Sequence, residues 1–146
     1  MAQTTGLLGE YLHTVDNKGR VALPARFREI LGPRFVIARG LDRCLVVYPS
    51  EEWALVLDAV RSLPQNQKDA RAYARYLLSG ACEVEPDRQG RILLPQPLRE
   101  YAGLGRDVYI LGVGNRAEVW DKAAWESAKQ DIGERFSTIA ESVPGI

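Results

Sequence analysis

An internal repeat constrains this chain more than any other feature of its sequence. The segment DNKGRVALPARFREILG, residues 16–32, aligns with DRQGRILLPQPLREYAG, residues 87–103, and eight of the seventeen positions are identical. After a one-residue insertion near Leu104, the match continues at an offset of 72 residues, which pairs Trp53 with Trp125. Two copies with a period of about 71 residues are unlike the short repeats of solenoid proteins. The sequence therefore predicts two related halves that form a pseudo-twofold pair.

The composition excludes several classes of protein. The 146 residues include 19 Lys and Arg against 19 Asp and Glu, and 46% are hydrophobic, which is unlike a disordered chain. Cys44 and Cys82 have no CxxC spacing, and His13 is the only histidine. The sequence therefore has too few suitably spaced residues to predict a zinc site or Cys/His catalysis. Neither a long apolar run nor a secretion signal is present, which predicts a cytoplasmic protein with no membrane contact.

Positive charge is concentrated in the first third of the chain. Residues 1–43 contain seven basic and four acidic side chains, whereas residues 108–146 contain four basic and six acidic ones. The N-terminal third is therefore the only electropositive part of the chain.

Local signals predict the same order of elements in both copies. Residues 10–15 and 20–23 have strand character, and DNKG between them supplies turn formers, which predicts a β-hairpin. Pro24 then starts a short helix that Gly32 ends. Strands are expected at residues 35–38 and 44–48, followed by a helix with Ser50 as its N-cap.

The second copy is expected to repeat this order. VYIL and AEVW are its later strands, GVG at residues 112–114 is interpreted as a hairpin turn, and Asp121 caps the helix KAAWESAKQ. Residues 67–78 add a helix to the first copy, with an apolar stripe of Ala70, Tyr73, Ala74 and Leu77. Trp53 and Trp125 are expected to pack against the sheet.

The doubled DxxxR pattern is the main candidate for function. An aspartate can accept the amides of its turn and hold the arginine four residues later, whose guanidinium suits phosphate oxygens or a guanine edge. The alternative is that the pair only fixes the turn. Because of the charge asymmetry, we interpret the first copy as the ligand-facing one, with Lys18, Arg20, Arg26 and Arg28 as the candidate contacts. The remaining motif residues are assigned a structural role: Asp16, Gly19, Asp87, Gly90 and Arg91.

Three segments together resemble a known family. GEYLHTVDNKGRVALPARFREIL, VEPDRQGRILLPQPLREYAGL and GVGNRAEVWDKAAWE are similar to the MraZ family, the two-copy branch of the AbrB/SpoVT superfamily of bacterial DNA-binding proteins. The resemblance extends from Gly6 to about Glu126. It implies an α+β, mainly β fold: a swapped-hairpin AbrB-like β-barrel built from two tandem repeats with flanking helices. It also implies a ring of chains that regulates transcription of the division and cell-wall gene cluster at direct repeats in its promoter.

These observations define the expected organisation. Residues 1–5 form an N-terminal extension, residues 6–80 the first repeat, and residues 81–146 the second repeat with a C-terminal helix. The expected partners are double-stranded DNA and further copies of the chain, in the cytoplasm and associated with the nucleoid. No cofactor, metal or small-molecule ligand is expected.

Two other functions are less consistent with the sequence. An antitoxin-like or scaffold module that binds another protein is the main alternative, but antitoxin-type relatives usually carry a disordered tail, and the stretch from Ala123 is expected to be helical. An enzyme is not expected, since no nucleophile and base accompany the carboxylates of Glu10, Asp16 and Asp87.

Overall fold

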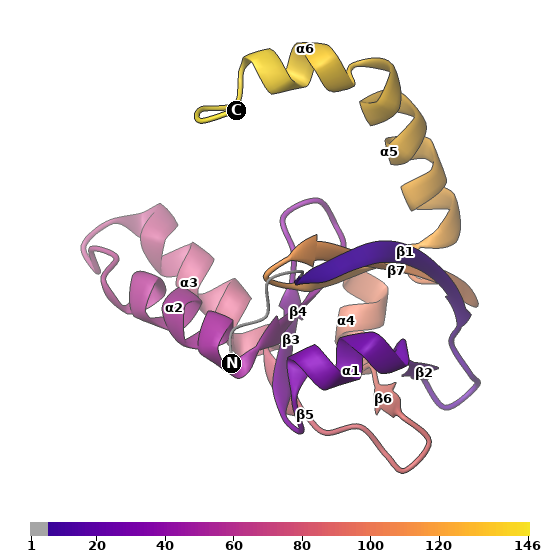
Figure 1. Cartoon of the computed structure of the whole chain (residues 1–146). Helices are drawn as coiled ribbons and strands as arrows, with labels where there is room; N and C mark the ends of the chain where they lie inside the picture. The colour runs from indigo at the N-terminus through magenta and orange to yellow at the C-terminus, as the bar shows by residue number, and fades with distance from the viewer. Residues whose placement is uncertain (1–5) are drawn as a thin grey trace.

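The computed structural model describes residues 6–146, which form two similar runs of helices and strands (Figure 1). The first run contains β1 (Leu7–Thr14), β2 (Arg20–Ala22), α1 (Ala25–Leu31), β3 (Phe35–Arg39), β4 (Leu45–Pro49), α2 (Ser50–Arg61) and α3 (Lys68–Gly80). The second contains β5 (Cys82–Val84), β6 (Arg91–Leu93), α4 (Gln96–Tyr101), β7 (Asp107–Gly114), β8 (Ala117–Asp121), α5 (Lys122–Glu134) and α6 (Phe136–Glu141). The expected extension at residues 1–5 lies outside the described residues. The fold is mixed, and its strand pairs are antiparallel.

Strand pairing interlocks the two copies. Six strands form one sheet in the order β1-β7-β8-β4-β3-β5, and β2 and β6 form a separate two-stranded sheet. The first strand of each copy pairs with the third strand of the other, because β1 pairs with β7 and β5 with β3. The pairs β4–β8 and β2–β6 also join the copies. Neither copy therefore completes its sheets alone.

The structure corrects the predicted hairpin. Residues 10–15 and 20–23 were expected to pair with each other, but β1 pairs with β7 and β2 pairs with β6. The chain does reverse between them, and the amide of Asp16 donates to the carbonyl of Arg20 at 2.8 Å. Beyond this turn the strands separate, because Val21 is buried opposite Ile92 of the other copy. Turn formers specify a reversal of the chain but not the partner of each strand.

The main core belongs to both copies. Equivalent residues of α1 and α4, Phe27 and Leu98, are fully buried in the same cluster. Strand residues from both copies complete it, among them Phe35, Ile37, Leu45, Val108, Ile110 and Val119. Because the buried apolar surface is shared, we expect the two copies to fold as one unit.

Two predicted helix boundaries are confirmed, whereas Pro24, predicted as the first helical residue, is the N-cap of α1, which begins at Ala25. Gly32 ends α1 with a φ of 83°, and Asp121 caps α5 by accepting a hydrogen bond from the amide of Ala124 at 3.3 Å. The cap predicted at Ser50 is wrong: Pro49 occupies the cap position, and the Ser50 hydroxyl donates to the carbonyl of Arg34.

The GVG segment at residues 112–114 ends strand β7 and does not itself form the predicted turn. The reversal follows at Asn115 and Arg116, where the amide of Val113 donates to the carbonyl of Arg116 at 3.0 Å. A Cβ on Gly112 would collide with the backbone of Leu8, so this glycine lets β1 approach β7.

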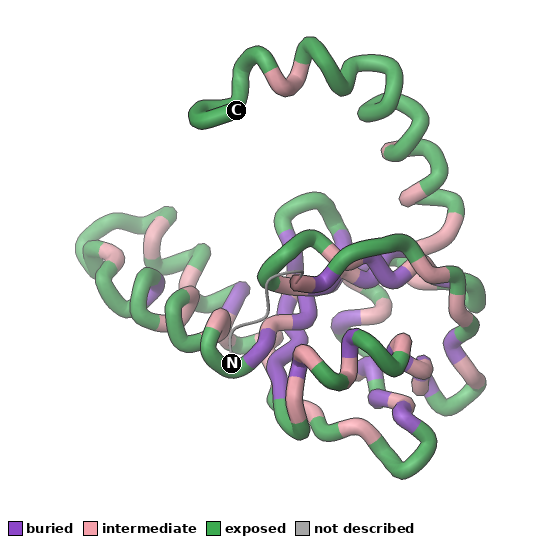
Figure 2. Tube along the Cα trace, viewed as in Figure 1, coloured by how far each residue is buried: buried purple, intermediate pink, exposed green. Residues whose placement is uncertain are grey.

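The outer helices cover the sheet unequally. Trp53 packs against Tyr48 and Trp125 against Trp120, with ring centroids 5.6 and 5.4 Å apart, which confirms the predicted packing. In α3, Leu77 is buried as the predicted stripe requires, whereas Tyr73 is exposed. Helix α6 buries none of its residues, and Figure 2 shows the exposed course of this segment. None of the helices within residues 6–146 has both the length and the apolar character needed to cross a membrane.

Candidate nucleic-acid interface

The first Asp–Arg turn is built by a network of short hydrogen bonds. Asp16 Oδ1 accepts from the backbone amides of Lys18 and Arg20, both at 2.9 Å. The amide of Gly19 donates to the Asp16 carbonyl at 2.9 Å, and Gly19 has a φ of 83°, a conformation that glycine adopts without strain. The aspartate therefore closes the turn as the sequence predicts.

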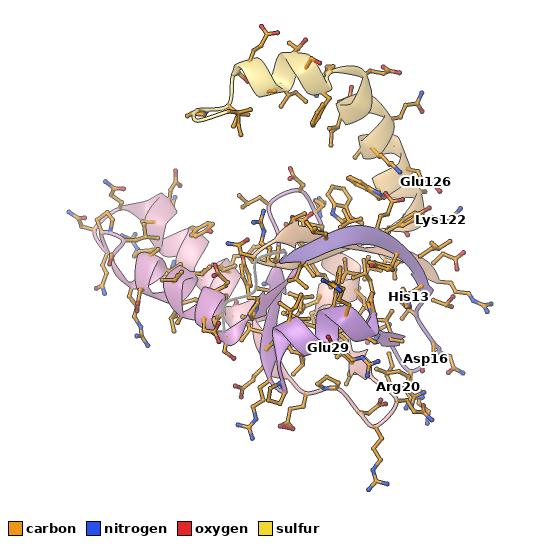
Figure 3. The ribbon with its side chains drawn as sticks, in the orientation of Figure 1. His13, Asp16, Arg20, Glu29, Lys122 and Glu126 are labelled. Atoms are coloured by element: carbon orange, nitrogen blue, oxygen red, sulfur yellow. The ribbon has the colours of Figure 1, made fainter. Side chains whose placement is uncertain are left out.

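The same aspartate orients the arginine. Arg20 Nε donates to Asp16 Oδ2 at 2.9 Å, and the Arg20 side chain remains 30% exposed. Figure 3 shows Asp16 and Arg20 close together at the end of the molecule opposite α6. Because Nε is held by the carboxylate, the terminal nitrogens of the guanidinium are positioned at the molecular surface.

The second turn reproduces this geometry. Asp87 Oδ1 accepts from the amides of Gln89 and Arg91 at 2.9 Å, and Asp87 Oδ2 accepts from Arg91 Nε at 2.9 Å. The Arg91 side chain is likewise 30% exposed. The two turns thus offer the same chemistry, although only the first was predicted to face a ligand.

Strands β2 and β6 bring the two turns together. Arg20 lies opposite Leu93, and Ala22 opposite Arg91. The carbonyl of Gly19 accepts from the amide of Leu94 at 2.8 Å, so the first turn is fastened to the other copy. The two Asp–Arg pairs also meet, because Arg91 Nη1 lies 3.9 Å from Asp16 Oδ2. We call this common face, formed by residues 16–22 and 87–93, the turn surface.

Arg28 lies against the opposite turn. A Cβ on Gly90 would come within 2.5 Å of the Arg28 guanidinium carbon, and a Cβ on Gly19 within 3.0 Å of that of Arg99. Arg28 Nε is buried without a hydrogen-bond partner, whereas Arg99 Nε donates to the carbonyl of Leu94. Each arginine therefore packs over the glycine of the other copy. The repeat alignment, which pairs Arg28 with Arg99, was the signal for this shared position.

The exposed cations flank the turns. Lys18 and Arg26 are exposed, as a contact with DNA requires. Arg88, which the sequence reasoning did not include, is exposed on the second turn. The position that matches Arg26 in the second copy is Pro97, so α1 brings a cation that α4 lacks.

The hydrogen bonds keep the motif aspartates ionised. Donation from the backbone amide of Arg20 is the main cause that lowers the pKa of the Asp16 carboxyl, with further contributions from the Arg20 side chain and the Lys18 amide. The amide of Arg91 is the main cause that lowers the pKa of Asp87. Both carboxylates therefore stay charged at neutral pH and hold their arginines.

The other carboxylate and imidazole candidates lie apart from the turn surface. Glu10 accepts from Trp125 Nε1 at 2.7 Å and from Lys129 Nζ at 3.1 Å, which ties β1 to α5. His13 lies opposite Val108 in the sheet, and burial lowers the pKa of its imidazole. Within residues 6–146, no group of three or more His, Cys, Asp and Glu side chains is placed to hold a metal ion.

The interlocked copies and their paired turns define a tandem-repeat protein whose two halves present one arginine-bearing surface. The family described as "MraZ protein, putative antitoxin-like" matches the chain twice, over residues 7–76 and 77–143. The chain belongs to the MraZ family.

Three relatives are similar to almost the entire chain. A protein of Acetivibrio thermocellus is 55% identical over 135 residues, which cover 92% of this chain and 94% of the relative. Proteins of Moorella thermoacetica and Desulfitobacterium hafniense are 51% and 50% identical, each covering 93% of this chain and 95% of the relative. All three are named "Transcriptional regulator MraZ". These names describe regulators and not enzymes, which confirms the expectation that the chain is not an enzyme.

Proposed function

We propose that this chain is a transcriptional regulator that binds double-stranded DNA through its turn surface. The observation that carries the proposal is the pair of Asp–Arg turns, in which a carboxylate holds each arginine and strands β2 and β6 place both turns on one face. Fixed arginines lose little conformational entropy on binding, and their forked donors match a guanine edge or phosphate oxygens. The relatives' names as transcriptional regulators support the same function.

The residues on and beside the turn surface have different proposed roles. Arg20 contacts a base edge or a deeply placed phosphate, while the exposed side chains of Lys18 and Arg26 contact phosphates and set the register on the duplex. Arg28, half-buried over Gly90, supports the second turn in addition to its predicted phosphate contact. Arg91 mainly holds the structure of its turn.

The finer fold proposed here is the swapped-hairpin barrel that the family resemblance implies. Its support is the exchange of strands between copies, with β1 on β7, β5 on β3 and β2 on β6, around one shared core. Such an exchange places both turns at one end of the barrel, and this position suits a contact with DNA.

The proposed target is the promoter of the bacterial division and cell-wall gene cluster, in the nucleoid-associated cytoplasm. A neutral chain with a handful of cations binds DNA weakly, in the range of ~10⁻⁴ to 10⁻⁶ M for non-specific contacts. A ring of identical chains presents the same face of each chain with the same polarity, which suits DNA sites arranged as direct repeats. Engagement of two or more faces then raises the affinity through effective concentration.

Titration of the promoter DNA by fluorescence anisotropy tests the proposal. Arg20→Ala is expected to weaken specific binding by about 5- to 150-fold, which corresponds to the ~1–3 kcal/mol of a good bidentate base contact. Arg61→Ala is the matched control, because Arg61 is an exposed arginine at the end of α2. Each phosphate contact removed should also reduce the salt slope by ~0.9. The mechanism would be contradicted if the affinity for promoter DNA changed neither with Arg20→Ala nor with salt concentration.

The alternative is an antitoxin-like module, which the description of the family supports. Helices α5 and α6 occupy residues 122–141, where antitoxin-type relatives have a loose tail, and this difference favours the DNA-binding proposal. A stoichiometric small protein that copurifies with the chain, together with no binding to its promoter, would favour the alternative.

A further inference from the structure

The C-terminal segment carries an apolar stripe that the chain does not cover. We define the arm as residues 122–143, which contain α5, α6 and the turn after them. Four large apolar side chains recur at spacings of four, three and four, namely Ile132, Phe136, Ile139 and Val143. In a continuous helix this spacing would place them on one face; in the structure Ile132 lies in α5, Phe136 and Ile139 lie in α6, and Val143 follows α6. Phe136 is 69% exposed, and Ile132 and Val143 are also exposed.

The distal part of the arm has no surface to pack against. The first part of α5 packs on the sheet through Trp125, but α6 buries no residue and is only six residues long. Helices of this length are marginal in water, and their stability in proteins comes from packing of an apolar face. Figure 1 shows α5 leaving the sheet and the chain turning beyond it, so that α6 and the C-terminus lie back above the rest of the molecule.

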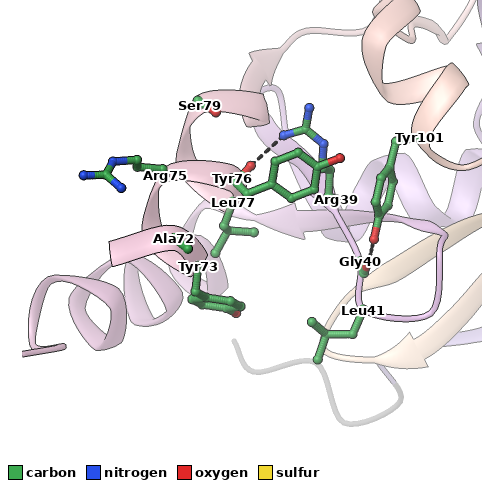
Figure 4. A pocket seen from close by; sticks show the side chains of 10 residues that line it. All are labelled: Arg39, Gly40, Leu41, Ala72, Tyr73, Arg75, Tyr76, Leu77, Ser79 and Tyr101. Carbon is green, nitrogen blue, oxygen red and sulfur yellow. Dashed lines mark hydrogen bonds between the residues drawn. The ribbon is translucent and has the colours of Figure 1, made fainter. Parts of the chain in front are cut away.

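A hollow beside α3 has the complementary character. It has a volume of about 650 Å³ and lies between α3 and the turn that joins β3 to β4 (Figure 4). Its lining includes Leu41, Tyr73, Tyr76 and Leu77. Leu41 is 85% exposed and Tyr76 55% exposed, so these apolar groups face solvent in the single chain. We call this hollow the α3 groove.

The rim of the groove is basic. Arg39 stacks on the Tyr76 ring, with its guanidinium carbon 3.8 Å from the ring centroid, and donates to the Tyr76 carbonyl at 2.6 Å. Arg39 Nε is buried without a hydrogen-bond partner, and Arg75 also lines the groove. Within residues 6–146, neither arginine forms an ion pair.

The arm is acidic beside its stripe. Asp131 pairs with Arg135 at 2.8 Å, but Glu134 and Glu141 form no ion pair within the described part of the chain. The arm therefore offers apolar side chains beside carboxylates that form no ion pair in the described residues. The groove offers an apolar floor beside guanidinium groups that likewise form none. Such complementarity selects a partner and its orientation.

We infer that the arm of one chain docks in the α3 groove of a second, identical chain, with Phe136 as its main apolar anchor. The contact is head-to-tail, because the arm and the groove are different surfaces of the same chain. The inference rests on the self-assembly in the proposed function and does not depend on how the turn surface contacts DNA.

Two single substitutions test the docking. Phe136→Asp places a charge in the stripe, and Leu41→Asp places one in the groove; both side chains are exposed, so the fold is expected to survive. Sedimentation equilibrium should show assemblies for the wild-type chain and monomers for each variant. Ser137→Asp on α6 and Leu12→Asp on β1 are controls at exposed sites outside the stripe and the groove, and both should assemble. Circular dichroism verifies the fold of every variant.

Mixing the two variants gives the decisive result. Leu41→Asp chains keep a working arm and Phe136→Asp chains keep a working groove, so the mixture should form a one-to-one dimer and nothing larger. Assembly by Leu41→Asp alone, with Phe136→Asp monomeric, would instead show that arms pair with each other. Unchanged masses for both variants would mean that the arm folds onto its own chain or stays free. Either result overturns the inference.

DNA binding separates this inference from the proposed function. A monomeric Phe136→Asp chain should retain weak, salt-dependent binding to a single site and lose the tighter binding to repeated sites. Loss of binding to the single site in a folded monomer would count against the turn-surface mechanism, whatever the masses show.

Discussion

The two copies are nearly identical at their turns and differ in the helices that follow their last strands. Asp16 and Asp87 hold Arg20 and Arg91 with the same bonds and the same 2.9 Å distances. After α2, in contrast, the first copy returns through α3, whose Leu77 is buried with Ala38 and Val60. After α5 the second copy continues into α6, which buries nothing.

This difference separates two tasks. Where the copies agree, they combine into one surface with local pseudo-twofold symmetry, which suits one extended ligand. Where they differ, the first repeat exposes a groove and the second an arm. Because these two surfaces are unlike, separate chains can associate head to tail. If the repeats divide the work in this way, substitutions at equivalent positions should have measurably different effects.

Substitution of equivalent core residues should lower the free energy of unfolding more than any other change. Phe27→Ala is expected to lower the free energy of unfolding by about 3–5 kcal/mol and Leu98→Ala by about 2–5 kcal/mol, because each leaves a cavity in the shared core. Urea denaturation followed by circular dichroism measures both. A single transition should persist in each variant, and two separate transitions would show that the copies fold independently.

Comparison of the motif arginines tests the functional difference between the turns. Arg20→Ala should weaken specific DNA binding by about 1–3 kcal/mol, and Arg91→Ala should weaken it clearly less. The reason is that Arg26 flanks the first turn, whereas Pro97 occupies the matching position in the second copy. Gel-shift titration of both variants gives the answer. Equal losses would show that the two turns contribute alike.

The turn glycines should have a smaller effect on stability. Gly19 and Gly90 have φ values of 83° and 78°, so alanine is expected to cost about 1–2 kcal/mol at each. Gly90→Ala should cost more, because its Cβ would lie 2.5 Å from the Arg28 guanidinium, against 3.0 Å from Arg99 for Gly19. Thermal unfolding compares them. Gly133→Ala in α5, where a Cβ meets open space, is the control and should be neutral or stabilising.

Substitution of the motif aspartates should have the smallest effect on the free energy of unfolding, and this effect should depend on pH. Their folded-state pKa values lie below the usual 3.8, so their stabilisation is complete above that value and is lost as the pH falls through the lowered pKa. Asp16→Asn and Asp87→Asn should therefore be less stable than the wild-type chain at pH 7, and the differences should shrink below about pH 4. Urea midpoints across this range provide the measurement. A difference independent of pH would exclude the carboxylate charge as its source.

Local features of the fold were accessible from the sequence. The repeat, the helix end at Gly32, the cap at Asp121 and the apolar contact of Leu77 each depend on a few neighbouring residues. The prediction of Ser50 as a cap failed within the same local range, since Pro49 shifted the start of the helix by one residue. Errors of this size are expected at helix ends.

The candidate site was only partly predictable. The sequence indicated that Asp16 closes a turn and orients Arg20, because both groups lie within five residues. It did not indicate that Arg28 lies on Gly90, or that the two turns share one surface with Arg88. Those relations join residues about 60 to 70 positions apart, and no local pattern encodes them.

The two copies of the motif, each with a carboxylate that holds an arginine across a glycine turn, could be predicted from the residues alone. The pairing of β1 and β2 with strands of the opposite repeat, and the single core and turn surface that result, could not. Backbone hydrogen bonds and burial of apolar side chains do not depend on which segment supplies the partner. The choice among possible partners is therefore made by the packing of the complete chain.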